Sequence, residues 1–118
     1  MSDAIRYNAR PVSLNASYGH HRRQRTKHVQ EWRDAFALLA LGKPHPAGPV
    51  DIEVRCGMSG TLQDIGNCYT SAKAAIDGLV LAGLLSDDTG EHIRSLTFYP
   101  PERVKPSEPD YLELTWHG

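Results

Sequence analysis

The chain has 118 residues, of which 40% are hydrophobic and 23% are charged, and its formal net charge is −1. This length favours one domain with a single modest core and excludes a second core of similar size. The composition is that of an ordinary globular protein. Because the sequence has neither an apolar run long enough for a membrane span nor an apolar N-terminal segment, we expect no membrane association, no secretion and a cytoplasmic location.

The first half of the chain contains one predicted helix and one clear strand. The first 26 residues are expected to be largely irregular, with an opening strand near either Ile5–Tyr7 or Val12–Leu14. Apolar residues recur at helical spacing over Thr26–Leu41, which predicts a helix with Thr26 as its cap. Gly42 and the proline-rich run after it end this helix. Apolar and charged residues alternate over Val50–Cys56, which predicts a half-buried strand.

The second half contains one predicted helix and two strands. Residues 57–63 are expected to form a loop, and a helix is predicted over Tyr69–Leu84 with Asn67 as its N-cap. Strands follow over His92–Tyr99 and Tyr111–Trp116, joined by a proline-rich turn. The order β-α-β-α-β-β predicts a single α+β domain, with a mixed sheet of about four strands covered by two helices. The apolar stripe of the second helix consists of Ala72, Ala75, Ile76, Leu79, Val80 and Gly83.

Aromatic and cysteine residues are assigned mainly to the interior. The helical or strand spacing of Trp32, Phe36 and Trp116 predicts core positions rather than platforms for base stacking. Cys56 and Cys68 are too few for a disulfide framework and lack the spacing of a zinc site. We therefore expect both to be reduced, structural thiols.

Charge is distributed unevenly along the chain. Residues 1–50 carry eight Lys or Arg and three Asp or Glu, a balance of +5, whereas residues 51–118 carry five and eleven, a balance of −6. The basic charge is concentrated in the run HHRRQRTKH, from His20 to His28, which contains no acidic residue. This division predicts a basic binding surface joined to an acidic centre.

Four aspartates and one lysine surround the second predicted helix, in the stretch LQDIGNCYTSAKAAIDGLVLAGLLSDD. Asp64 precedes the helix, Lys73 and Asp77 lie on it outside the apolar stripe, and Asp87 and Asp88 follow it. They are either solvated caps, turns and a surface ion pair, or hard oxygen ligands for a divalent cation. A lysine before its aspartate is the weaker orientation for a helical ion pair. Adjacent carboxylates also oppose the dipole at a helix C-terminus.

The same block resembles the central motif of the RusA family of Holliday-junction resolvases. In that family an Asp-x-Asp-Asn stretch precedes a helix that holds a Lys and an Asp, and the helix ends in Ala-Gly followed by Asp-Asp. The N-terminal part is similar as well, with an Asn before an aromatic residue, then His and Arg, then a helix containing a Trp. The resemblance covers about residues 11–117. The matching positions include Asn15, Tyr18, His20, Arg22, Arg23, Arg25, Asp64, Asn67, Lys73, Asp77, Leu79, Ala82, Gly83, Asp87 and Asp88.

Two departures from the family pattern concern the acidic block, residues 62–88. Gly66 stands where the family usually has its second carboxylate. The gap between Asn67 and Lys73 is also three residues longer than in the best-known members of the family. The extra length could place Asp77 or a water as the missing ligand. The D-x-G-N spelling is associated with phage-borne relatives.

The resemblance implies a Mg²⁺-dependent endonuclease, with Mn²⁺ able to substitute, that resolves four-way or otherwise branched DNA junctions by paired phosphodiester hydrolysis. It implies a homodimer that acts in DNA recombination or repair in a bacterial or phage-infected cell. Asp64, Lys73, Asp77 and Asp88 would be catalytic, and Asp64, Asp87 and Asp88 would hold the metal. The basic segment, residues 15–33, would bind DNA. The residues expected to contact DNA are Asn15, His20, Arg22, Arg23, Arg25, Lys27 and Asn67.

Two other functions stay open at this point. The chain could bind junctions without cutting them, having lost its chemistry with the second carboxylate at Gly66. It could also be a more general metal-dependent nuclease that acts on flaps or on RNA. The retained pair of Asp64 and Asp88 favours an active enzyme over the first of these.

Overall fold

The computed structural model describes residues 2–11, 22–60, 68–87 and 89–118, and for residues 22–25 it describes the backbone alone. The elements in these ranges follow the order β-α-β-α-β-β-β, so the predicted α+β class is confirmed. One short strand, the sixth element, was not predicted. The elements are β1 (Ser2–Tyr7), α1 (Arg22–Ala40), β2 (Val50–Met58), α2 (Tyr69–Leu81), β3 (Ile93–Phe98), β4 (Glu102–Arg103) and β5 (Tyr111–His117).

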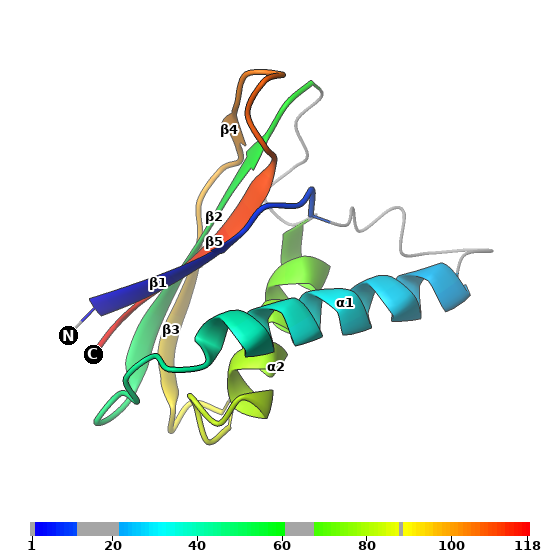
Figure 1. The fold of residues 1–118 in the computed structure, drawn as a ribbon. Helices are drawn as coiled ribbons and strands as arrows, with labels where there is room; N and C mark the ends of the chain where they lie inside the picture. Colours follow the sequence, from blue (N-terminus) through cyan, green and yellow to red (C-terminus); the bar gives the residue numbers. More distant parts are fainter. Residues whose placement is uncertain (1, 12–21, 61–67, 88) are drawn as a thin grey trace.

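The strands form one mixed sheet in the order β1-β5-β2-β3, and the short strand β4 pairs with the end of β2. Strand β5 runs antiparallel to both of its neighbours, whereas β2 and β3 are parallel. Parallel neighbours need a crossover connection, and α2 provides it. Both helices lie on the same face of the sheet (Figure 1). No described element covers the opposite face.

The core lies between the two helices and the covered face of the sheet. Cross-strand register places Ile52 opposite Trp116 and Val54 opposite Leu114, so the inward-facing residues of β2 and β5 form one apolar surface. Trp32 and Phe36 of α1 stack against each other with ring centroids 6.1 Å apart. Trp32, Phe36 and Trp116 are all buried, as predicted.

The two helices approach each other closely at Gly78. A β-carbon at this position would overlap the backbone carbonyl oxygen of Arg33 and crowd the β-carbon of Phe36. Only glycine therefore allows this separation between the two backbones. Sequence periodicity places Gly78 on the helix, but it gives no information about which element faces it.

The bounds of both helices differ from the prediction. Helix α1 begins at Arg22, so Thr26 lies inside it and is not its cap. Helix α2 ends at Leu81, and Gly83 adopts a left-handed conformation with φ +79°. The Gly83 amide donates to Val80 and the next amide donates to the carbonyl of Leu79, which is the hydrogen-bond pattern of a Schellman motif.

The N-terminal boundaries were also predicted only in part. Cys68, not Asn67, occupies the N-cap of α2, and its side chain makes no capping hydrogen bond. Strand β1 contains the predicted Ile5–Tyr7 strand, whereas the alternative at Val12–Leu14 lies outside the described residues.

Candidate functional site

The predicted site residues are distributed among described and undescribed parts of the chain. Asp64 and Asp88 lie outside the described residues, and so do Asn15, His20 and Asn67. Asp87 is exposed in the segment that follows α2. Lys27 is exposed on α1, and the three predicted DNA-contacting arginines lie in the first turn of this helix, where only the backbone is described: Arg22, Arg23 and Arg25.

Lys73 and Asp77 form an ion pair on the solvent side of α2. The lysine Nζ donates to Asp77 Oδ1 over 2.9 Å, and the two side chains are 44% and 41% exposed. The apolar stripe turns the opposite side of the helix inward, where Ala75 and Leu79 are buried. A helical pair this exposed contributes only about 0.3–0.5 kcal/mol to stability. The predicted proximity of Lys73 and Asp77 is confirmed.

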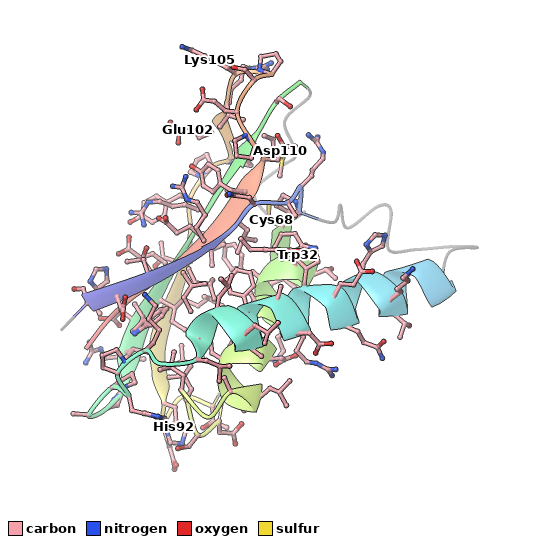
Figure 2. The ribbon with its side chains drawn as sticks, in the orientation of Figure 1. Trp32, Cys68, His92, Glu102, Lys105 and Asp110 are labelled. Carbon is pink, nitrogen blue, oxygen red and sulfur yellow. The ribbon has the colours of Figure 1, made fainter. Side chains whose placement is uncertain are left out.

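The ends of α2 are well separated. A helix of 13 residues spans about 20 Å. Figure 2 shows Cys68 at one end of α2, while His92, which follows the segment containing Asp87, lies near the other. Asp64 and Asp88, which flank these two ends in the sequence, lie outside the described residues, so the described structure does not place the predicted ligand set. In its described part, the chain contains no group of three or more His, Cys, Asp or Glu side chains placed to hold a metal ion.

The basic segment forms the start of α1. The N-terminal end of this helix extends past α2 (Figure 1). Its first turn contains no acidic residue. The N-terminal end of a helix carries a partial positive charge, so cationic side chains there oppose the dipole and gain no helix stability from it. The same arrangement concentrates positive potential at a projecting end of the molecule, where an anion would be attracted.

Two carboxylates on the uncovered face of the sheet were not singled out from the sequence. The Tyr99 hydroxyl, with Arg55 and His117, lowers the pKa of Glu53 to about 2. His117 Nε2 donates to Glu53 Oε1 over 2.6 Å, and in that tautomer Nδ1 accepts from the Ser2 hydroxyl. These contacts join three strands, so a strand-by-strand interpretation of the sequence cannot find them.

The second of these carboxylates is Asp51. Arg94 donates two hydrogen bonds to it, over 3.0 and 2.7 Å, and Ser95 donates a third over 2.7 Å. Hydrogen bonds from Arg94 and Ser95 lower the pKa of Asp51 to about 2. Both carboxylates are thus occupied by protein donors, and neither is arranged as an open metal ligand.

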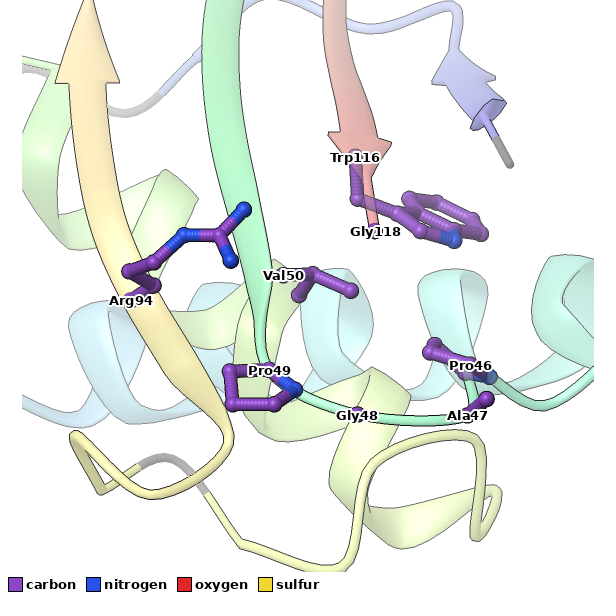
Figure 3. A pocket seen from close by; sticks show the side chains of 8 residues that line it. All are labelled: Pro46, Ala47, Gly48, Pro49, Val50, Arg94, Trp116 and Gly118. Carbon is purple, nitrogen blue, oxygen red and sulfur yellow. The ribbon is translucent and has the colours of Figure 1, made fainter.

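Two cavities lie at the end of the sheet where β2 begins. One, of about 390 Å³, is lined by Pro46, Pro49 and Trp116, with the guanidinium of Arg94 at its edge (Figure 3). The other, of about 420 Å³, adjoins the segment after α2 and is lined by residues that include Ser86 and His92. The Lys73–Asp77 pair lines neither cavity.

Comparison with protein-family models finds no match, and neither does a search among curated proteins. The resemblance to the RusA family thus rests on the motif residues alone. Among the residues that the structure describes, no helix is both long enough and apolar enough to cross a bilayer.

Proposed function

We propose that this chain is a metal-dependent endonuclease that cuts four-way or otherwise branched DNA. The observation that carries the proposal is the exposed Lys73–Asp77 pair on α2, in a span bounded by Asp64 before the helix and by Asp87 and Asp88 after it. The pair adds little to stability and has the weaker orientation for a helical ion pair. A lysine beside these carboxylates would neutralise the negative charge of a phosphate that binds there.

The donor set fits a hard divalent cation. Asp64, Asp87 and Asp88 offer carboxylate oxygens only, which are the donors that Mg²⁺ and Mn²⁺ prefer. When bound, such a cation supplies Lewis-acid stabilisation of the charge on phosphate oxygens. Asp77 is the carboxylate that we assign to the place left by Gly66, and its bond to Lys73 would have to give way for that role.

The chain's own cations account for DNA binding in this proposal. The Lys73 ammonium is a compact charge on a flexible stem, and it can exchange Asp77 for a phosphate oxygen. The basic start of α1 would bind phosphates along the DNA, which positions the protein without reading the base sequence. Paired cuts in a four-way junction need two sites related by a two-fold axis, so we propose a homodimer.

Cleavage of a synthetic four-way junction in Mg²⁺, compared with EDTA, tests the proposal. Asp64→Asn and Asp88→Asn should abolish cleavage. Junction binding should stay intact or tighten, because each substitution removes a negative charge that would repel the DNA phosphates at the site. Asp34→Asn, an exposed aspartate on α1, is the matched control and should cut normally. Cleavage by either ligand variant at the wild-type rate would show that the metal assignment is wrong.

A mixing experiment tests whether the Asp64 and Asp88 of one site come from the same protomer or from both protomers of the dimer. Protomers with Asp64→Asn and protomers with Asp88→Asn are coexpressed and their mixed dimers are assayed. If each site combines Asp64 of one protomer with Asp88 of the other, a mixed dimer keeps one intact site and makes single nicks. If both residues come from the same protomer, the mixed dimer is inactive.

A junction-binding protein without nuclease activity is the second candidate. The observation that favours it is Gly66, which removes one carboxylate from the family pattern. This candidate predicts a shifted junction band in a gel and no cleavage in Mg²⁺ or Mn²⁺. A third outcome, cutting of flaps or RNA in preference to junctions, would identify a more general nuclease.

A further inference from the structure

Two cysteine thiols lie in contact between the sheet and α2. The sulfur atoms of Cys56, on β2, and Cys68, at the start of α2, are 3.0 Å apart and share a hydrogen bond. Neither cysteine is in a disulfide, and both are buried. Together with Met58 they form a small cluster that is separate from the main core.

The local structure explains why the two thiols meet. Cys56 continues the inward-facing series of β2 that includes Val54, so its side chain points toward the helices. Cys68 occupies an N-cap position, where serine, threonine or aspartate would usually accept a backbone hydrogen bond. The Cys68 side chain makes no such bond, and its sulfur contacts Cys56 instead.

We propose that Cys56 and Cys68 are a redox-active pair that closes to an intramolecular disulfide when the protein is exposed to hydrogen peroxide. A disulfide requires a sulfur–sulfur distance of about 2.05 Å, so an approach of about 1 Å is needed from the present contact. This proposal does not depend on the nuclease function. It adds a redox role to two cysteines that the sequence predicts to be reduced, structural thiols, and the structure shows no disulfide between them.

Either thiol can donate the hydrogen bond between them, so either can supply the first nucleophile. The thiolate of that cysteine attacks one peroxide oxygen, the O–O bond breaks, and sulfenic acid and water form after one proton transfer. The sulfur of the other cysteine then attacks the sulfenic sulfur, the S–O bond breaks, and a second water leaves with the thiol proton. The two thiols lose two electrons in total, and the peroxide gains them.

The disulfide would tie the end of β2 to the start of α2. Segment 57–67, which carries Asp64 and Asn67, would then be held between two covalently joined ends. Closing a ring of this size restricts the unfolded chain, and we expect Tm to rise by about 10 °C. Peroxide is small enough to reach the thiols when the beginning of α2 opens locally.

The test uses the wild-type protein, reduced and then treated with hydrogen peroxide. We expect intact mass to fall by two hydrogen atoms, a peptide map to link Cys56 to Cys68, and Tm to rise, with all three changes reversed by dithiothreitol. In Cys68→Ala the ring cannot close, so peroxide should produce neither the linked peptide nor the rise in Tm.

Three results would overturn the proposal. In the first, both thiols stay free in the folded protein at a peroxide dose that oxidises them in urea. In the second, a non-reducing gel shows that the cysteines link different chains. In the third, the intramolecular disulfide lowers Tm, which would mean that the native contact cannot accommodate it. All three are measured on wild-type protein, so the test does not depend on whether Cys68→Ala folds.

Discussion

Replacing Lys73 with alanine should separate stability from function. The lost ion pair with Asp77 spans 2.9 Å, but both side chains are more than 40% exposed, so the loss costs about 0.3–0.5 kcal/mol. Alanine is a slightly better helix former than lysine, which offsets part of this cost. The unfolding free energy should therefore change by less than about 0.5 kcal/mol, and Tm by less than about 3 °C.

Cleavage should respond much more strongly than stability. If Lys73 contacts the scissile phosphate, its removal should slow the cleavage step by about 100-fold, by analogy with the loss of one oxyanion donor. A 100-fold loss corresponds to about 2.7 kcal/mol of barrier, several times the expected change in stability. Junction affinity should fall only slightly, because one phosphate contact among many is lost.

Single-turnover cleavage at saturating Mn²⁺ measures this effect, with urea unfolding of the same samples. Lys43→Ala is a matched control, because Lys43 forms a similar ion pair with Asp3 over 3.1 Å on another part of the molecule. The control should keep its cleavage rate. Normal cleavage by Lys73→Ala would refute the reasoning, and the Lys73–Asp77 pair would then be only a surface ion pair.

Three further predictions concern packing, pH and DNA binding. Gly78→Ala should destabilise the protein by about 1–3 kcal/mol in urea unfolding, because the new methyl group meets the backbone of Arg33; a more stable variant would contradict the close helix crossing. The pKa of Glu53 is lowered to about 2 in the folded state. The ionised Glu53 side chain therefore stabilises the fold above its unfolded pKa of about 4.5, and this stabilisation is lost as pH falls from about 4.5 towards 2. Glu53→Gln should flatten the pH dependence of the unfolding free energy in that interval. Replacing the basic residues at the start of α1 with alanine should weaken binding to duplex and branched DNA alike and reduce the salt dependence of binding. Unchanged DNA affinity at low salt would show that this helix end faces away from DNA. The residues to replace together are Arg22, Arg23 and Arg25.

The sequence was most informative where burial alternates or recurs with a fixed period. Strand β2 was predicted within two residues of its end, because Asp51 and Glu53 alternate with buried apolar residues. The start of α1 was missed because the basic run before Val29 has no apolar periodicity to mark it. Gly83 has helical spacing from Leu79 and was assigned to the helix, although its positive φ ends it.

The candidate site could be predicted only as far as local spacing determines contacts. Residues four apart on a helix are neighbours, so the Lys73–Asp77 pair followed from the sequence. The contact between Cys56 and Cys68 depends on where α2 begins relative to the sheet, which spacing does not specify. The network around Glu53 depends on the register of several strands, and no single segment encodes it.

The position of β5 between β1 and β2 has a consequence for how the chain folds. Ser2 pairs with His117, so β1 gains its sheet partner only through a contact that spans nearly the whole sequence. By contrast, β2, α2 and β3 follow one another and can associate locally. Long-range pairing is slow because the intervening chain must first be ordered. On a ribosome, β1 emerges before β5, and it must wait for β5 before it can join the sheet.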